Sequence, residues 1–245
     1  RTTETGRYVL VDAGAARLWM FEDGRPVDSM RVIVGEKATE TPMMAALLRF
    51  VSVNPWWNTP PDFAQKSVAP HVLKEGLKYL TDRDYQVLSD WTDNAVPIDP
   101  ATVDWQAVAD GRANVRLRRG PGAWNSMGDM KFMMPNDFGI YLHDVPDASK
   151  ALFKTEDRWI SNGCIRLEDA DRFAKWLFGR VPQGQDPKVE ENVDLAQPVP
   201  VYVTYLTAEA GPNGPKFRAD PYNRDPALLA RYFGDGQQEV AELGR

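Results

Sequence analysis

Alternating apolar and polar residues near the start of the chain predict a β-meander. Apolar positions recur in segments 8–11, 17–21 and 30–34, and an Asp-Gly pair at 23–24 separates the second segment from the third. An Asp-Gly pair between two strand-like segments is one of the stronger short-range signals for a β-hairpin. Segment 47–53 is rich in β-branched and aromatic residues and predicts a further strand.

The alternation stops between residues 62 and 112 and resumes afterwards. Apolar residues in this block follow an imperfect helical spacing, at Val68, Val72, Leu73, Leu77 and Leu80. Strand-like patterning returns in segments 114–119, 131–134 and 140–143. The pattern therefore predicts a helical insertion within a mainly β domain.

The last third of the chain predicts a helix, a strand and an extension. Apolar residues at 170, 173, 174, 176 and 177, followed by Gly179, are typical of an amphipathic helix that ends at a glycine. Segment 199–206 predicts a last strand, with Pro200 limiting its pairing at that end. Within the extension 207–245 we expect a helix over 226–233 and a frayed end in the last ten residues.

The composition indicates a folded protein without a nucleic-acid partner. Of 245 residues, 43% are hydrophobic and eight are tryptophan, which is typical of a chain that buries a core. The net charge is −6, whereas a nucleic-acid partner normally requires a basic face. We expect no transmembrane segment, because no apolar stretch is long enough to cross a bilayer. The chain begins with arginine and without a signal-peptide pattern, so we expect a processed chain from which a signal sequence has been removed.

One cysteine and two histidines limit the chemistry of the chain. A single cysteine excludes an intrachain disulfide and any metal site built from several cysteines. We expect neither a metal ion nor another cofactor. A cysteine nucleophile served by a histidine base is one interpretation of these residue types. A buried, inert cysteine is the other, and residue types alone leave both open.

The cysteine lies in the octet 160–167, Ile-Ser-Asn-Gly-Cys-Ile-Arg-Leu, just before the predicted amphipathic helix. A thiol is nucleophilic when it is partly ionised, and a helix N-terminus and a nearby cation both favour ionisation. We therefore predict that Cys164 lies at a helix N-terminus, near Arg166, where the thiolate is favoured. The candidate base is His143, which ends the apolar segment 139–143.

Two motifs with this order and spacing resemble those of the YkuD-type L,D-transpeptidases. They are Tyr141-Leu142-His143-Asp144 and Ser161-Asn162-Gly163-Cys164-Ile165-Arg166. Three further segments resemble the long, YcbB-like branch of the family, namely 54–61 with Trp56 and Trp57, 116–122, and 131–136 with Phe132. The resemblance extends from about residue 8 to about residue 205, with all motifs in the family's order.

The resemblance implies a fold and a function. The fold is mainly β with α: a YkuD-like β-sandwich catalytic domain over 1–61 and 113–206, an inserted helical capping subdomain over 62–112, and the extension 207–245. The function is that of a periplasmic L,D-transpeptidase that cross-links peptidoglycan stem peptides through a thioester. Carbapenem-type β-lactams are the inhibitors that the resemblance implies.

The resemblance also assigns roles to residues around the cysteine. Cys164 is the nucleophile, His143 the general base, and the backbone N–H groups of Gly163 and Cys164 are expected to bind the oxyanion. Asp144 supplies either a carbonyl that orients His143 or a carboxylate used elsewhere. The residues expected to bind substrate are Arg166, Ser161, Asn162, Tyr141, Trp56, Trp57 and Phe132.

For several of these residues the role stays open. Arg166 can favour the thiolate, hold a substrate carboxylate or fix the loop. The hydroxyl of Ser161 can brace the loop. Trp56 and Trp57 form either a corner of the core or an aromatic wall of the substrate groove.

Two other functions fit the same sequence. With water as the acceptor, the same fold would be an L,D-carboxypeptidase. With a buried and inert Cys164, the chain would be a non-catalytic cell-wall-binding module. The sequence sets neither the acceptor nor the length of the donor stem.

Overall fold

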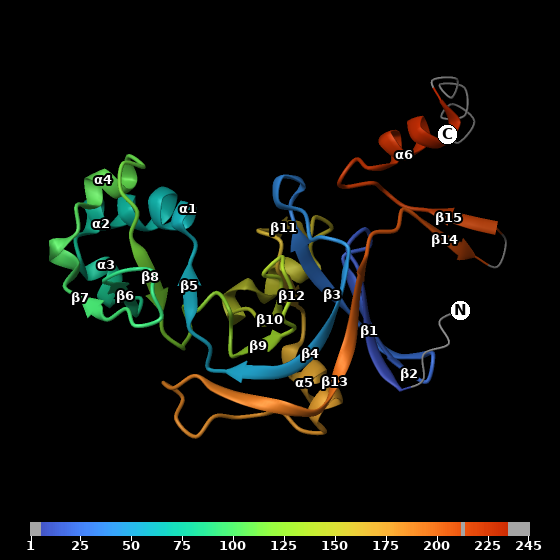
Figure 1. Cartoon of the computed structure of the whole chain (residues 1–245), viewed down its shortest axis with the longest axis horizontal. Helices are drawn as coiled ribbons and strands as arrows, with labels where there is room; N and C mark the ends of the chain where they lie inside the picture. The colour runs from blue at the N-terminus through green and yellow to red at the C-terminus, as the bar shows by residue number, and fades with distance from the viewer. Residues whose placement is uncertain (1–5, 212–213, 235–245) are drawn as a thin grey trace.

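A computed structural model describes residues 6–211 and 214–234, and its main element there is a nine-stranded sheet (Figure 1). The strand order is β11-β3-β12-β10-β9-β4-β13-β1-β2, and β2 also pairs with β3. This last pairing closes the sheet on itself, so the two halves of the predicted sandwich are joined around one core. The strands are β1 (Arg7–Asp12), β2 (Arg17–Glu22), β3 (Arg25–Gly35), β4 (Met44–Val53), β9 (Met130–Met133), β10 (Leu142–His143), β11 (Trp159–Ser161), β12 (Ile165–Leu167) and β13 (Glu191–Thr204).

The meander predicted at the start of the chain is present. β1, β2 and β3 pair antiparallel in sequence order. Between β2 and β3, Asp23 has a φ of 47° and Gly24 a φ of 74°, the left-handed pair that a type I′ hairpin requires. β4 is the next predicted strand, and it begins at Met44 instead of residue 47.

The last predicted strand is longer than expected. β13 starts at Glu191 and continues through Pro200, which lies opposite Leu47 of β4. β1 pairs with β13 only from Val201 onward, so one side of the strand is unpaired at the proline. A missing N–H is tolerated at such a position, which is why Pro200 does not end the strand.

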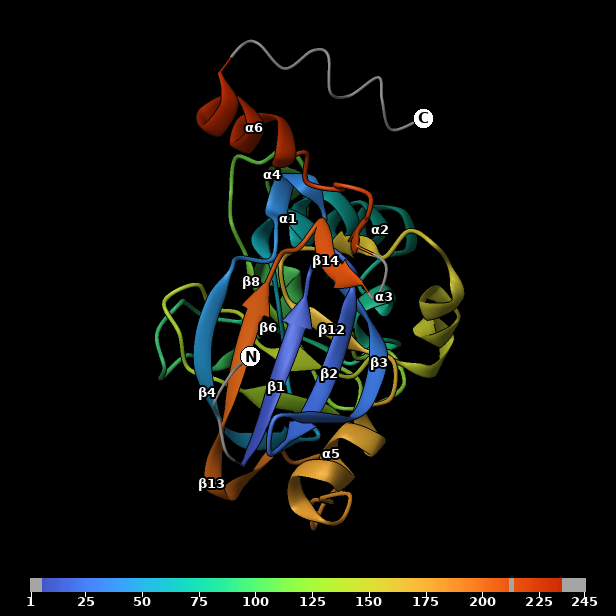
Figure 2. The ribbon, with the colours of Figure 1, turned by 90° about the vertical axis from the view of Figure 1, so that its right-hand side faces the viewer.

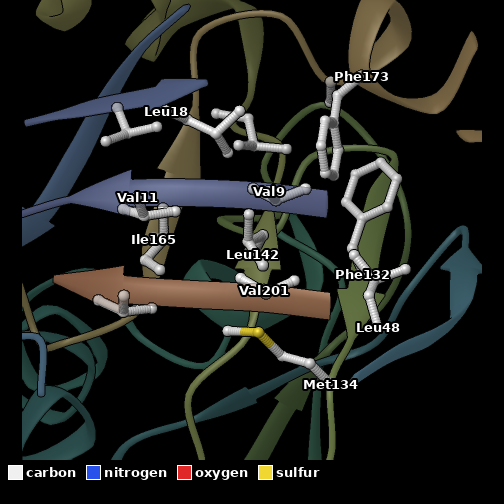
Figure 3. Close-up of a cluster of buried hydrophobic side chains, with 14 of the residues drawn as sticks. Val9, Val11, Leu18, Leu48, Phe132, Met134, Leu142, Ile165, Phe173 and Val201 are labelled. Atoms are coloured by element: carbon white, nitrogen blue, oxygen red, sulfur yellow. The ribbon is translucent and has the colours of Figure 1, made fainter. Parts of the chain in front are cut away.

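The core lies inside the closed sheet (Figure 3). Leu142 of β10 and Ile165 of β12 are paired across the two strands, and both are fully buried. Phe132 of β9 meets Phe173 edge to face, with 5.0 Å between the ring centroids. Phe173 belongs to α5 (Ala170–Phe178), which covers one end of this core.

Helix α5 confirms the predicted amphipathic helix. The side chain of Asp169 caps its first turn by accepting a hydrogen bond from the backbone N–H of Arg172 at 2.9 Å. Gly179, with a φ of 74°, ends it in the left-handed conformation. Its buried face consists of Ala170, Phe173, Ala174 and Leu177.

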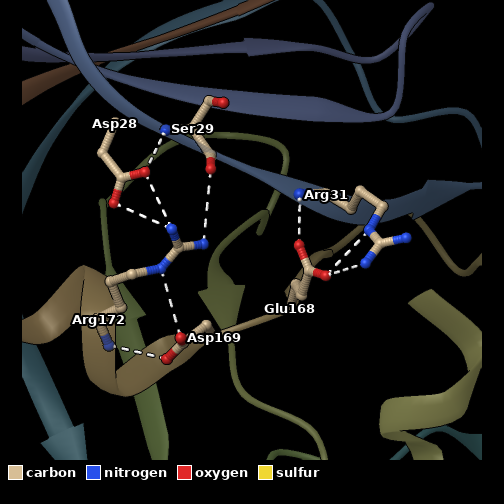
Figure 4. A network of polar contacts seen from close by, with 6 residues as sticks. All are labelled: Asp28, Ser29, Arg31, Glu168, Asp169 and Arg172. Carbon is tan, nitrogen blue, oxygen red and sulfur yellow. Dashed lines mark hydrogen bonds and ion pairs between the residues drawn. The ribbon is translucent and has the colours of Figure 1, made fainter. Parts of the chain in front are cut away.

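Ion pairs fix α5 and the end of β12 against β3 (Figure 4). Glu168 follows β12 and accepts hydrogen bonds from the backbone N and Nε of Arg31, both at 2.9 Å. Arg172 of α5 lies 2.9 Å from Asp28 of β3 and 3.3 Å from Asp169. Partly exposed pairs contribute little one by one. Here they join three elements and hold the short strand β12 in register.

A smaller unit lies beside the large sheet (Figure 1). Its four-stranded sheet has the order β5-β8-β6-β7, and its helices surround a second core. Its strands are β5 (Trp57–Thr59), β6 (Tyr85–Leu88), β7 (Pro97–Ile98) and β8 (Arg116–Arg119). Its helices are α1 (Pro61–Phe63), the π-helix Ala64–Val68, α2 (Ala69–Glu75), α3 (Lys78–Thr81), the 3₁₀-helix Pro100–Thr102 and α4 (Trp105–Ala109).

The insertion predicted over 62–112 therefore differs from the smaller unit in two ways. It contains two strands, β6 and β7, where the sequence predicts helical character. Its sheet also includes β5 and β8, which the sequence analysis assigns to the catalytic domain. Strands of two to four residues are too short to produce a clear alternating pattern.

The chain continues past β13 into the extension (Figure 2). A hairpin of β14 (Ala208–Gly211) and β15 (Gly214–Phe217) leads to α6 (Asp225–Phe233), which confirms the helix predicted over 226–233. The predicted frayed end lies outside the described residues. Two more 3₁₀-helices are Lys37–Thr39 and Asp147–Lys154. Among the described helices, none combines the length and apolarity needed to cross a membrane.

Replacing Phe132 with alanine is expected to lower the free energy of unfolding by about 3–5 kcal/mol, because a buried ring leaves a cavity that the core cannot refill. Urea unfolding measures the change. The matched control is Phe217→Ala, at a phenylalanine that is 79% exposed, which should change stability by about 0.5 kcal/mol or less. Unchanged stability in Phe132→Ala would contradict this placement in the core.

Candidate active site

The alternation of β10 and β12 decides which side chains meet at the candidate site. Successive side chains of a strand point to opposite faces of the sheet. Because the paired residues Leu142 and Ile165 point into the core, the next pair along, His143 and Arg166, points to the other face. The residues that precede each strand follow the same alternation. The outer face therefore carries Tyr141, His143, Cys164 and Arg166.

His143 is buried, with 2% of its surface exposed. Its Nδ1 lies 2.5 Å from the carbonyl oxygen of Asp144, which can only accept, so Nδ1 carries the proton of the neutral ring. Nε2 is then the free acceptor. Burial and, next, the charge of Arg166 lower the pKa of His143 from 6.5 to about 3, with a smaller contribution from Lys131. The resting imidazole is therefore neutral, with its basic nitrogen unprotonated.

Asp144 combines the two roles that the sequence left as alternatives. Its carbonyl orients His143. Its carboxylate forms an ion pair with Lys150 and accepts a hydrogen bond from the backbone N–H of Asp129 at 3.1 Å. Gly128 makes room for this carboxylate, since a Cβ there would lie 2.6 Å from its carbon. The carboxylate charge of Asp144 is thus paired with Lys150 and does not contact the His143 ring, which bonds the carbonyl instead.

The helix predicted next to Cys164 begins further along the chain. Cys164 precedes strand β12, and α5 starts only at Ala170. A strand of three residues leaves no alternating pattern in the sequence, so the sequence does not distinguish β12 from the residues that lead into the helix. In the described part of the chain, no helix therefore begins at Cys164.

The expected resting thiolate is also wrong. Burial raises the pKa of Cys164 above its ordinary value of 9.0, and this outweighs hydrogen bonds from Tyr141 and the charges of Arg166 and Lys131. Cys164 is half-buried. At neutral pH the site holds a protonated thiol beside a neutral imidazole.

Tyr141 is the direct neighbour of the sulphur. It lies across from Cys164, and its carbonyl accepts a hydrogen bond from the N–H of Ile165 at 3.1 Å. Burial, and then the nearby Cys164, raise the pKa of the Tyr141 phenol, so the hydroxyl keeps its proton and can donate it in a hydrogen bond. Within the described part of the chain, the sulphur makes no hydrogen bond to His143, which lies one diagonal step away. Such bonds are often long or misaligned in substrate-free enzymes.

A tight reversal presents the cysteine. β11 runs parallel to β3 and β12 antiparallel to it, so the chain turns back between Ser161 and Ile165. Gly163 takes a φ of 106° in this turn, a conformation that other residues rarely adopt. Residues 161–164 are called the nucleophile loop below.

Ser161 is 1% exposed and braces the nucleophile loop, which is one of the roles left open for it, while its contact with substrate stays a prediction. Its Oγ donates to the carbonyl of Cys164 at 2.7 Å and accepts from the N–H of Gly163 at 3.2 Å. One of the two expected oxyanion donors, the Gly163 N–H, is therefore occupied. The other, the Cys164 N–H, has no partner among residues 6–211 and 214–234.

Two cations border the site without a carboxylate partner. Arg166 and Lys131 are half-buried, and neither forms an ion pair in the part of the chain that the structure describes. Lys131 lies opposite His143 on β9, and its ammonium is 5.4 Å from the centre of the Tyr141 ring. The site is therefore positively charged, which favours anions.

Comparison with known proteins assigns the family. The YkuD family model, which describes an L,D-transpeptidase catalytic domain, matches residues 6–203. The chain belongs to the YkuD family. A Haemophilus influenzae protein named "Putative L,D-transpeptidase" is 32% identical over 207 residues, which are 82% of the chain and 41% of that protein. The chain thus spans less than half the length of this relative.

Solved structures of L,D-transpeptidases are similar at low identity. The catalytic domain of the Enterococcus faecium enzyme acylated by ertapenem is 14% identical, with 82% of the chain and 99% of that domain covered and a TM-score of 0.38. L,D-transpeptidase 3 from Mycobacterium tuberculosis is 14% identical, with 81% of the chain and 61% of that chain covered and a TM-score of 0.39. None of these matches distinguishes the YcbB-like branch, which stays a prediction.

The aromatic residues predicted to bind substrate occupy different places in the YkuD domain. Phe132 is fully buried in the core, so its assignment to the substrate is wrong. Trp57 is 8% exposed and packs in the core of the smaller unit. Trp56 lines a hollow of about 360 Å³ with residues of that unit, and none of the nucleophile loop lines it. Asn162 is exposed next to the cysteine.

Sequence reasoning missed three residues that shape the site of this YkuD domain. Lys131 could be found from its alternation with Phe132, since neighbours on a strand face opposite ways. Lys150, which pairs with Asp144, lies in a loop without a pattern. Thr41 hydrogen-bonds the nucleophile loop from a distant segment, and no local signal reveals that contact.

Replacing His143 with glutamine is expected to reduce the pH dependence of stability between pH 6.5 and about pH 3. Below pH 6.5 the unfolded chain binds a proton that folded His143 rejects, so the wild-type free energy of unfolding falls as the pH falls, by up to about 1.4 kcal/mol per pH unit. Above that pH this group adds no pH dependence. Urea unfolding across the range measures the slope.

The matched control for this slope is His71→Gln, which removes an exposed histidine of α2 and leaves His143 unchanged. Identical slopes in His143→Gln and the wild type would show that His143 is protonated in the folded protein.

Proposed function

We propose that the chain is the catalytic part of a peptidoglycan L,D-transpeptidase, with Cys164 as nucleophile and His143 as general base. The observation that supports it most is the shared outer face of β10 and β12, which carries the cysteine and a neutral histidine with a free Nε2. Membership of the YkuD family supports the reaction class. Because peptidoglycan lies outside the cytoplasm, the mature protein would be periplasmic.

In the first step the donor stem acylates the enzyme. The thiol proton passes to Nε2 of His143 while the sulphur of Cys164 attacks the carbonyl carbon. Collapse of the tetrahedral intermediate breaks the C–N bond, and the imidazolium gives its proton to the departing amine of the terminal D-residue. A thioester on Cys164 remains.

In the second step an acceptor resolves the thioester. An amine of a second stem, such as that of a diaminopimelate residue, attacks the thioester carbon and loses a proton to His143. The C–S bond breaks, and the leaving sulphur takes the proton back. The cross-linked product leaves with Cys164 restored as a thiol.

Two donors can stabilise the oxyanion. The backbone N–H of Cys164 has no other partner in the described regions, and the Tyr141 phenol stays protonated beside the sulphur. Removing one such donor typically costs about 10²–10³ in rate. Gly163 would join them only if its bond to Ser161, at 3.2 Å, were released.

The two cations provide a place for a stem-peptide carboxylate. A base with a pKa of about 3 accepts a thiol proton poorly, and after burial the main cause of that low value is Arg166. A substrate carboxylate paired with Arg166 would cancel this charge and raise the pKa of His143. Substrate binding would then activate the base.

The smaller unit is the candidate cap of the substrate groove. The insertion 62–112 and the half-buried Trp56, which lines the hollow of about 360 Å³, stay proposed contacts of the stem peptides. Carbapenem-type β-lactams, which present an acyl group to a nucleophile, are the proposed inhibitors. No cofactor enters either step.

Replacing Cys164 with alanine is expected to abolish cross-linking, by on the order of 10⁴-fold or more, because the nucleophile is lost. His143→Gln should lower the rate by about 10²–10⁴-fold, because the base is lost. Mass spectrometry of products from a tetrapeptide stem and an isotope-labelled acceptor stem measures the reaction.

The same assay separates the alternatives. Labelled dimer supports transpeptidation, and release of the terminal residue with free stem alone supports an L,D-carboxypeptidase. A Cys164→Ala chain with full turnover would contradict the mechanism. Intact mass spectrometry after carbapenem treatment should find one adduct, on the peptide that contains Cys164, and a binding module would give none.

Replacing Arg166 with glutamine is expected to raise the KM for the donor stem by about 10–100-fold, the usual value of a hydrogen bond to a charged group. The acidic limb of the pH profile of kcat/KM should also move to higher pH, because the charge that lowers the pKa of His143 is removed. The control is Arg25→Gln, at an exposed arginine of the β2–β3 hairpin. Unchanged KM and profile would exclude Arg166 from substrate binding.

A further inference from the structure

We infer that Thr41 and Tyr222 are positioning residues of the nucleophile loop, linked in one chain of hydrogen bonds that makes the C-terminal extension part of the active-site support. This inference rests on the proposed function and deepens it. The segments involved are the support loop, residues 36–41 after β3, and the clasp, residues 218–225 of the extension.

The hydroxyl of Thr41 joins the support loop to the nucleophile loop. It accepts a hydrogen bond from the N–H of Gly35 at 2.9 Å and donates to the carbonyl of Gly163 at 2.7 Å. Thr41 is fully buried, so no solvent competes for these bonds. Its hydroxyl thus fixes the peptide group that ends in the Cys164 N–H, the proposed oxyanion donor.

Further bonds from the support loop reach the start of the nucleophile loop. The N–H of Glu36 donates to the carbonyl of Ser161 at 2.9 Å, and the hydroxyl of Thr39 donates to the same oxygen at 3.2 Å. The support loop also packs tightly on Gly35, where a Cβ would lie 2.0 Å from the carbonyl oxygen of Thr39. The nucleophile loop is therefore held at both ends by the support loop.

Tyr222 of the clasp holds the support loop in turn. Its hydroxyl donates to the carbonyl of Gly35 at 2.8 Å and accepts from the N–H of Thr41 at 3.3 Å. Tyr222 is 2% exposed. The Tyr222 hydroxyl thus hydrogen-bonds both ends of the segment 35–41, at Gly35 and at Thr41.

The clasp is itself fixed to the domain. The ring of Tyr222 stacks on that of Tyr205 at 4.9 Å, and its N–H donates to the Tyr205 hydroxyl at 3.0 Å. Arg224 pairs with Glu40 of the support loop at 3.0 Å and lies over both tyrosine rings. Arg218 pairs with Asp12 at the end of β1 at 2.6 Å. Tyr222 is therefore held in place although it belongs to no strand or helix itself.

This arrangement matters for rate because the nucleophile loop has no regular structure of its own. Its only strand residue is Ser161, and the remaining peptide groups depend on side-chain bonds for their position. A displacement of roughly 1 Å in a reacting group can cost about 10² in rate. Loss of either hydroxyl should therefore slow acylation more than it weakens substrate binding.

The test compares Thr41→Val, Thr41→Ser and Tyr222→Phe in the full chain. Acylation by a carbapenem, followed by mass spectrometry, should slow by between about 10 and 10²-fold in Thr41→Val and Tyr222→Phe at saturating inhibitor. Thr41→Ser keeps the hydroxyl and should stay within about threefold of the wild type, well inside the loss expected for a displaced loop. Alkylation of Cys164 by iodoacetamide, which needs no oxyanion donor, should not slow in any variant.

Hydrogen exchange at the Gly163 and Cys164 amides gives a readout that does not depend on activity. It should become faster in Thr41→Val and Tyr222→Phe, while urea unfolding verifies that the variants are folded. The matched control is Thr207→Val, which removes a hydroxyl of the extension whose one hydrogen-bond partner among the described residues is Asp225. It should leave both acylation and exchange unchanged.

The outcomes separate the two levels of the proposal. A wild-type chain that the carbapenem does not acylate contradicts the proposed function, and the exchange rates then still decide whether Tyr222 orders the loop. Wild-type acylation with unchanged rates and exchange in both variants overturns the positioning role. Equal losses of acylation in the variants and in Thr207→Val overturn it as well, because the effect would then not be specific to the loop.

Discussion

The pairing of Leu142 with Ile165 in the core is the constraint on which the active site depends. Each of these side chains gains roughly 1.5–3 kcal/mol from burial. A slip of β10 by one residue would turn Leu142 outward and bring His143 into the apolar core, and the same slip of β12 would exchange Ile165 for Arg166. Burying an unpaired guanidinium there is far more costly than losing one apolar contact. The register, and with it the composition of the outer face, is therefore strongly determined.

The same burial sets the resting charge of the site. A carboxylate on Nδ1 of His143 would favour the imidazolium, but here a carbonyl occupies that position and the carboxylate of Asp144 is paired with Lys150. The imidazole and the thiol of Cys164 both remain neutral as a result. Positive charge without a counter-ion in the described regions remains on Arg166. The site thus provides the electrostatic environment for a negative charge before any is present, which is how preorganised sites stabilise a transition state.

Local sequence patterns predict the elements that are long or have a distinctive turn. They fail for strands of only three or four residues. The Asp-Gly pair predicted the β2–β3 hairpin, and the apolar spacing and glycine stop predicted α5. The strand β12, with three residues, leaves too short a pattern to be distinguished from the approach to that helix, so the helix N-terminus expected at Cys164 was wrong. Phe132 alternates with Lys131 on β9, and this alternation, not the motif that contains both residues, indicates its place in the core.

Contacts across long distances in sequence left no local signal at all. The Thr41 hydroxyl and the Gly163 carbonyl are 122 positions apart, and the Tyr222 hydroxyl and the Gly35 carbonyl are 187 apart. Their partners are backbone carbonyls, which every residue has, so residue types cannot identify such bonds. Only the folded arrangement of the closed sheet brings these segments together.

The position of the cysteine explains why such distant contacts are needed. A residue of β12, which pairs on both sides, gives its backbone N–H to the ladder, so a cysteine inside β12 could not offer that N–H to an oxyanion. The chain reversal at Gly163 takes Cys164 out of the ladder and leaves its N–H available, at the cost of the ladder's support. Side-chain hydroxyls from other segments then replace that support. A nucleophile with a free backbone donor therefore requires a loop, and a loop in a fixed position requires bonds from elsewhere in the chain.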